Sequence, residues 1–206
     1  MKQEQNFERE LPSGYRQAKY INAKNAKFGI IFNLIALLVF AVEMVVAVLL
    51  LLGKEDFSFV EDVFMNDYYF LALFVFSFVM LGGYIVLHEL VHGIAYKALT
   101  GEKLTFGISW SCAFCGVPHI YTYRRTAIIS VVAPFAVFTL LLLSLLILFY
   151  FISPMCFIFC AAIFGLHTGG CSGDLYVLGL FLFKFRDKRA LMRDTGPEQK
   201  FYGPQE

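Results

Sequence analysis

The stretch "LGGYIVLHELVHGIAYKALTG", residues 81–101, decides how the rest of this sequence is interpreted. It has the apolar character of a membrane-spanning helix, yet it contains His88, Glu89 and His92. Ionisable side chains inside a span are costly, and they usually mark a functional site. Three of them within five residues therefore indicate function and argue against a chance cluster.

The spacing of these three residues is that of an HExxH zinc motif. Residues four apart on a helix share one face, so His88 and His92 can reach one ion. Glu89 lies about 100° around the helix from His88, which suits a general base beside a metal better than a ligand. The alternative is a pair of interfacial histidines near the cytosolic end of the span, with Glu89 paired to a lysine.

The overall composition is that of an integral membrane protein. Of the 206 residues, 59% are apolar and 16% are charged, and the mean hydropathy is +0.67. Soluble domains are nearer half apolar and a quarter charged. The net charge of +1 argues against a nucleic-acid-binding surface, which needs a basic excess. The pair Cys112 and Cys115 is a weak zinc or redox signal, because a structural zinc site needs four ligands.

Four apolar runs are long enough to cross a bilayer, which takes about 20 residues. We predict an all-α fold, namely a polytopic membrane helix bundle with four transmembrane spans. The fourth run contains "HTGGCSGD", whose glycines permit close helix packing and a break in the helix. The predicted spans cover about residues 28–52, 68–98, 126–151 and 155–183.

Lysine and arginine alternate between the polar segments, which sets the orientation. Both tails are rich in basic residues, whereas the joint after the first span has only Lys54. We therefore expect both termini in the cytosol. The predicted organisation is a basic tail (1–27), a transmembrane metalloprotease-like domain (28–185) and a disordered C-terminal tail (186–206).

Asp174 is the candidate third metal ligand, because it is the only formal charge between Arg125 and Lys184. The second and fourth spans both run toward the cytosol. His88 precedes Lys97 by nine residues, and Asp174 precedes Lys184 by ten. At about 1.5 Å per residue the two groups lie at similar depth. An unpaired carboxylate there would be very costly, although a protonated carboxylic acid is the alternative.

Two further histidines are auxiliary candidates. His167 precedes Asp174 by seven residues, which puts it about 10 Å away on an unbroken helix. That distance argues against a shared ion and favours a hydrogen-bonded residue of the bundle. His119 lies in the cytosolic segment between the second and third spans. It is a candidate for substrate or oxyanion contacts, with an ordinary loop histidine as the default.

Four pieces of sequence resemble a known family in order and spacing. The chain is similar to bacterial membrane proteins described as "putative zincin peptidases", and more broadly to the site-2-protease class of intramembrane zinc metalloproteases. The resemblance covers about residues 70–185. It departs from site-2 proteases at the aspartate, which lacks their upstream asparagine and proline, and this affects substrate clamping more than metal binding. The matching pieces are "HELVHG", "CAFCGVP", "RRTAIISVVAPF" and "GGCSGDLYVL".

The resemblance implies zinc ligation by His88, His92 and Asp174, with Glu89 as the catalytic carboxylate. We expect a Zn²⁺-dependent endopeptidase, embedded in the bacterial cell membrane, that hydrolyses a membrane protein or peptide near the cytosolic leaflet. The alternatives are a non-proteolytic zinc-binding sensor or assembly factor, and a small transporter with Glu89 and Asp174 as an ion relay. The sequence gives no indication of the oligomeric state.

Overall fold

The computed structural model describes residues 6–54, 67–109 and 113–205. The chain folds into two compact units, to which the long helices contribute different parts. We call the first the sheet unit; it comprises Met1–Ile31, Leu87–Pro134 and Gly173–Glu206. We call the second the helical unit; it comprises Phe32–Val86 and Phe135–Ser172.

Four stretches of helix are long and apolar enough to cross a membrane, by length and composition. This confirms the prediction of four such helices. The fourth is not one regular helix, because α5 ends at Gly170 and α6 starts at Ser172, on either side of Cys171. The helices are α1 (Ala26–Leu52), α3 (Asp67–Thr100), α4 (Arg124–Ile152), α5 (Pro154–Gly170), α6 (Ser172–Gly179) and the π-helical η1 (Leu180–Lys184).

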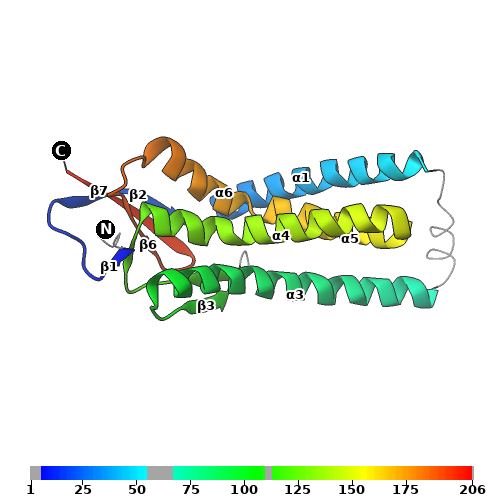
Figure 1. Cartoon of the computed structure of the whole chain (residues 1–206), viewed down its shortest axis with the longest axis horizontal. Helices are drawn as coiled ribbons and strands as arrows, with labels where there is room; N and C mark the ends of the chain where they lie inside the picture. Colours follow the sequence, from blue (N-terminus) through cyan, green and yellow to red (C-terminus); the bar gives the residue numbers. More distant parts are fainter. Residues whose placement is uncertain (1–5, 55–66, 110–112, 206) are drawn as a thin grey trace. The chain divides into compact units, whose positions relative to one another are not determined.

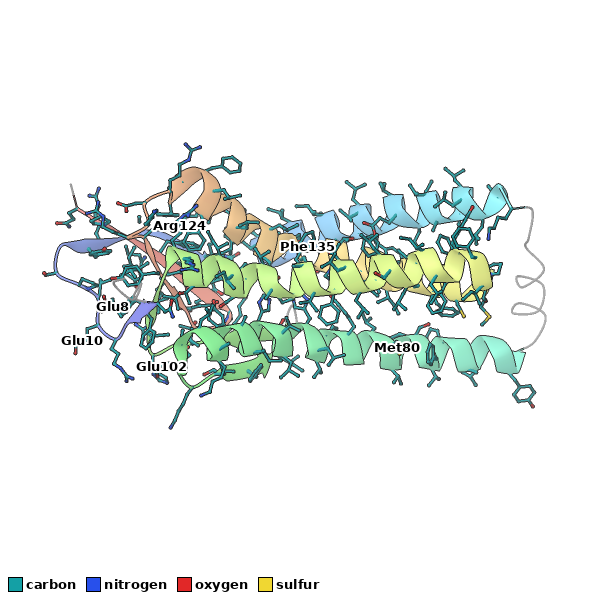
Figure 2. All side chains as sticks on the ribbon, viewed as in Figure 1. Glu8, Glu10, Met80, Glu102, Arg124 and Phe135 are labelled. Atoms are coloured by element: carbon teal, nitrogen blue, oxygen red, sulfur yellow. The ribbon has the colours of Figure 1, made fainter. Side chains whose placement is uncertain are left out.

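Large apolar side chains project outward from these helices. Leu38 of α1 is 65% exposed and Leu140 of α4 is 70% exposed. Figure 2 shows the same pattern along α3, where the labelled Met80 is 41% exposed. Apolar surface on this scale is unfavourable in water, so it fits contact with lipid.

The sheet unit contains a five-stranded antiparallel sheet, so the all-α prediction is wrong. Two of its strands lie in the segment 186–206, for which we expected disorder, and two lie in the N-terminal tail. Figure 1 shows β2 (Tyr15–Asn22), β6 (Leu191–Asp194) and β7 (Glu198–Pro204) together, although they come from opposite ends of the chain. The strand order is β1 (Phe7–Glu8), β5 (Tyr121–Tyr123), β6 (Leu191–Asp194), β7 (Glu198–Pro204) and β2 (Tyr15–Asn22).

Aromatic packing joins the sheet to the end of the fourth stretch. The rings of Phe181 and Phe185 lie 5.2 and 5.0 Å from the ring of Phe201 on β7. Arg124, labelled in Figure 2, donates from Nε to the carbonyl oxygens of Phe181 and Phe185, at 3.2 and 3.1 Å. A cation next to the last carbonyl oxygens of a helix stabilises that helix end. Arg124 therefore holds the end of η1 against the start of α4.

A second hairpin, β3 (Thr105–Ile108) and β4 (Ala113–Gly116), also belongs to the sheet unit. Its end fits tightly against the turn between β6 and β7. A Cβ atom at Gly116 would lie 2.3 Å from the backbone nitrogen of Gly196, whose φ is +94°. The Val117 amide also donates to the Asp194 carbonyl at 2.8 Å. Glycine is therefore required at both positions of this contact.

In the helical unit, α5 packs closely against α1. A Cβ atom at Gly169 would lie 2.7 Å from the carbonyl oxygen of Ala36. One at Gly165 would lie 3.0 Å from the ring of Phe40. Small residues four apart allow helix backbones to approach in this way. The helix α5 itself begins with an N-cap, because the Ser153 side chain accepts from the Cys156 amide.

Candidate metal centre

The centre of the candidate site is a single carboxylate oxygen with two imidazoles around it. The Nε2 atoms of His88 and His92 each lie 3.3 Å from Oδ2 of Asp174. All three residues belong to the sheet unit. The two imidazoles are about 10% exposed, whereas the Asp174 side chain is 22% exposed. The structure thus brings the predicted third ligand to the two histidines and leaves the carboxylate partly accessible.

Helical spacing on α3 and the break before α6 position these groups. His88 and His92 lie on one face of α3, one turn apart, and their rings are 5.0 Å apart. Asp174 lies in the first turn of α6, three residues after the break at Cys171. A carboxylate is favourable in the first turn of a helix, because the unpaired backbone amides there carry partial positive charge.

A backbone carbonyl on α4 orients His92. The Nδ1 atom of His92 lies 2.8 Å from the carbonyl oxygen of Ser130. A carbonyl oxygen only accepts, so Nδ1 carries the hydrogen and Nε2 of the neutral ring is left with a lone pair. That lone pair faces the Asp174 carboxylate, which is also an acceptor. The arrangement is satisfied by a proton or a metal ion between the two atoms.

Glu89 lies beside this group. Its carboxylate oxygen and one nitrogen from each of His88 and His92 all lie within 4.8 Å of one another. The half-buried Glu89 side chain also interacts with the backbone amide of Cys115, on β4. Glu89 therefore lies next to the imidazoles, at the helix position that adjoins His88, and within reach of the hairpin.

A buried hydrogen bond one turn further along α3 was not anticipated from the sequence. The Tyr96 hydroxyl donates to Oδ2 of Asp194 at 2.7 Å, and the Gly196 amide donates to Oδ1 at 2.8 Å. Burial raises the pKa of Asp194 from 3.8 to about 6. The one feature of the sequence that could have indicated this hydrogen bond is Tyr96, a polar aromatic residue four positions after His92 and on the same face of the helix. Asp194 lay in a segment expected to be disordered.

A family described as "putative zincin peptidase" matches residues 81–188, which is more than half of the chain. The chain belongs to this family. No curated protein and no solved structure matches it significantly. The segment matched to the zincin peptidase family contains the paired imidazoles, Glu89, Ser130 and Asp174.

Within the zincin peptidase segment, the two auxiliary histidines have different surroundings. His167 is fully buried in the helical unit, where Nδ1 lies 2.8 Å from the Tyr84 hydroxyl and Nε2 lies 3.0 Å from the Thr139 hydroxyl. Two such partners support a hydrogen-bonding role within the bundle. His119 is exposed in the turn between β4 and β5. Cys112 lies outside the described residues, so the structure does not test the cysteine pair.

Proposed function

We propose that this zincin-family protein is a zinc-dependent, membrane-embedded endopeptidase. The observation that carries the proposal is the approach of two imidazole Nε2 atoms to one oxygen of Asp174, with His92 held from behind by the Ser130 carbonyl. Metal-ligating histidines commonly donate their other ring N–H to such an acceptor. The family match and the buried group of His88, Glu89 and His92 agree with it.

The donor set fits zinc. Two imidazole nitrogens and one carboxylate oxygen are one of the common sets of protein ligands of a catalytic zinc ion, with a fourth position left open. The hydrogen bond from His92 to Ser130 leaves the Nε2 lone pair facing Oδ2 of Asp174, and two acceptor atoms repel each other. A cation bound by His88, His92 and Asp174 would remove this repulsion. When bound, zinc would supply Lewis acidity, which polarises a carbonyl group and acidifies a neighbouring water.

Glu89 is the proposed general base. Its carboxylate accepts a proton from the attacking water as the new C–O bond forms at the scissile carbonyl carbon. It then returns that proton to the amine nitrogen as the peptide C–N bond breaks, so the catalyst ends in its starting state. The Cys115 amide holds the Glu89 side chain in position for both transfers.

The proposed substrate is a membrane protein or peptide, cleaved near the cytosolic leaflet. The four apolar helices and the alternation of basic segments support a membrane location with both termini in the cytosol. The partial exposure of the Asp174 side chain supports access of a substrate to the site.

Glu89→Gln tests the proposal in the purified full-length protein. The variant should retain zinc, measured by mass spectrometry of metals, and should lose peptide-bond hydrolysis by more than about 100-fold. Glu10→Gln, at an exposed position labelled in Figure 2, is the matched control and should retain both. If Glu89→Gln hydrolyses peptide bonds as fast as the wild type, Glu89 is not the general base. If the variant loses hydrolysis but keeps both zinc and the biological activity of the wild type, the non-proteolytic zinc-binding alternative is favoured.

A further inference from the structure

The helical unit contains a cavity that the proposed peptidase chemistry does not use. Its volume is about 550 Å³, which lies within the range of small-molecule sites, about 300–1,000 Å³. It is bounded by side chains of α1, α4 and α5, and Glu43 is the one charged residue in this lining within the described part of the chain. The lining residues include Val46, Leu143, Ile147, Tyr150, Phe151 and Phe164.

One carboxylate oxygen of Glu43 lacks a hydrogen-bond donor among the described residues. Its Oε1 atom accepts from the Thr168 hydroxyl at 2.8 Å. Its Oε2 atom is buried and has no hydrogen-bond partner among the described residues. A buried carboxylate oxygen without a donor is strongly unfavourable, and such groups are rare in folded proteins. The cavity that Glu43 lines is therefore incomplete without a donor.

The packing of α1 against α5 makes room for this carboxylate. A Cβ atom at Gly165 would lie 3.3 Å from Oε2 of Glu43, tighter than most contacts. Thr168, which holds the other oxygen, lies one turn later on the same helix. Both α5 residues that meet Glu43 are therefore compatible with a carboxylate at this position.

The aromatic part of the lining already accommodates a cation. The Lys54 Nζ atom lies 4.0 Å from the centre of the Tyr150 ring and 5.4 Å from that of Phe151. It also donates to the Tyr150 carbonyl oxygen. Ammonium groups are attracted to the faces of aromatic rings. Because Lys54 already takes this aromatic position, the Glu43 carboxylate is the group in the cavity that is left for the charge of a ligand.

We propose that this cavity binds a lipophilic ammonium compound. The ammonium group donates to Oε2 of Glu43, and the apolar body fills the space between α1, α4 and α5. A primary ammonium supplies both the missing donor and the opposite charge, and ion pairing is the usual state of an acid within a membrane span. The apolar lining excludes strongly hydrated ligands.

The test compares a rigid amine with its neutral counterpart. We would titrate 1-aminoadamantane and 1-adamantanol by calorimetry into the full-length protein in lipid nanodiscs, with empty nanodiscs as the blank. The amine should bind the wild type at least about tenfold more tightly than the alcohol. Glu43→Gln should remove that preference, because it neutralises the carboxylate while keeping its shape.

A second pair of variants tests the location. Leu143→Trp fills the cavity and should abolish binding of the amine, whereas Leu141→Trp, at an exposed α4 position turned away from the lining residues, should leave it unchanged. Both retain Glu43, so this comparison holds even where Glu43→Gln fails to fold. Equal binding of amine and alcohol, or equal binding by both tryptophan variants, would overturn the proposal. Neither result depends on peptidase activity.

Discussion

The Nδ1 atom of His92 lies 2.8 Å from the backbone carbonyl oxygen of Ser130, while Nε2 of the same ring lies 3.3 Å from Oδ2 of Asp174. The first contact places the hydrogen of the neutral ring on Nδ1, so that the lone pair on Nε2 is directed at the carboxylate. The ring is thus prepared to bind a cation before one arrives.

Asp174→Asn should lower the zinc affinity of the purified protein by more than about 100-fold, because it removes a proposed zinc ligand. Removing a residue that only hydrogen-bonds to a ligand typically lowers metal affinity by about 10- to 100-fold, and the loss of a ligand itself should be larger. Competition with a chelator of known affinity measures it. Asp187→Asn is the matched control. Asp187 is exposed and pairs with Arg189 at 2.8 Å, so its substitution should leave zinc binding intact. Equal zinc affinity of the two variants would exclude Asp174 as a ligand.

Ser130→Ala should keep the zinc affinity of the wild type. The residue holds His92 through its backbone carbonyl, which alanine also provides. The Ser130 hydroxyl is buried and has no hydrogen-bond partner in the part of the chain that the structure describes. Removing it should therefore maintain or slightly raise the thermal unfolding temperature. A tenfold loss of zinc affinity would mean that the hydroxyl itself contributes.

Deprotonation of the buried Asp194 carboxyl group should lower the stability of the protein as the pH rises from about 4 to 6. Its pKa is about 6 in the fold and 3.8 without burial, so the folded state binds more protons in that window. The free energy of unfolding should fall by roughly 3 kcal/mol across it. Asp194→Asn should remove this part of the pH dependence, measured as the difference from wild type in unfolding scans. Parallel curves for the two proteins would contradict the assignment.

Gly169→Ala should destabilise the packing of α1 against α5 by about 1–3 kcal/mol, because its Cβ would lie 2.7 Å from the Ala36 carbonyl oxygen. The neighbouring Gly170→Ala is an unusually close control, since a Cβ there has no heavy atom within 4 Å. Thermal unfolding in one detergent compares them. Should the Gly170 variant unfold at the lower temperature, the described packing would be wrong.

The sequence was informative where the signal was local or followed from topology. The spacing of His88 and His92 requires only a helix, and the depth argument for Asp174 requires only spans that run in the same direction. Both anticipated the observed proximity. Strand formation by 191–204 depends on pairing with distant segments, including β2, and short strands with charged residues carry no clear local pattern. The role of Ser130 rests on its backbone, so its side-chain type gave no signal.

The order of strands in the sheet has a consequence for biosynthesis. The strand β7, formed by residues 198–204, separates β2 from β6. A nascent chain cannot close this sheet until residues 198–204 have left the ribosome. A stop codon just before β7 that spares every apolar helix would therefore leave β2 without its neighbour.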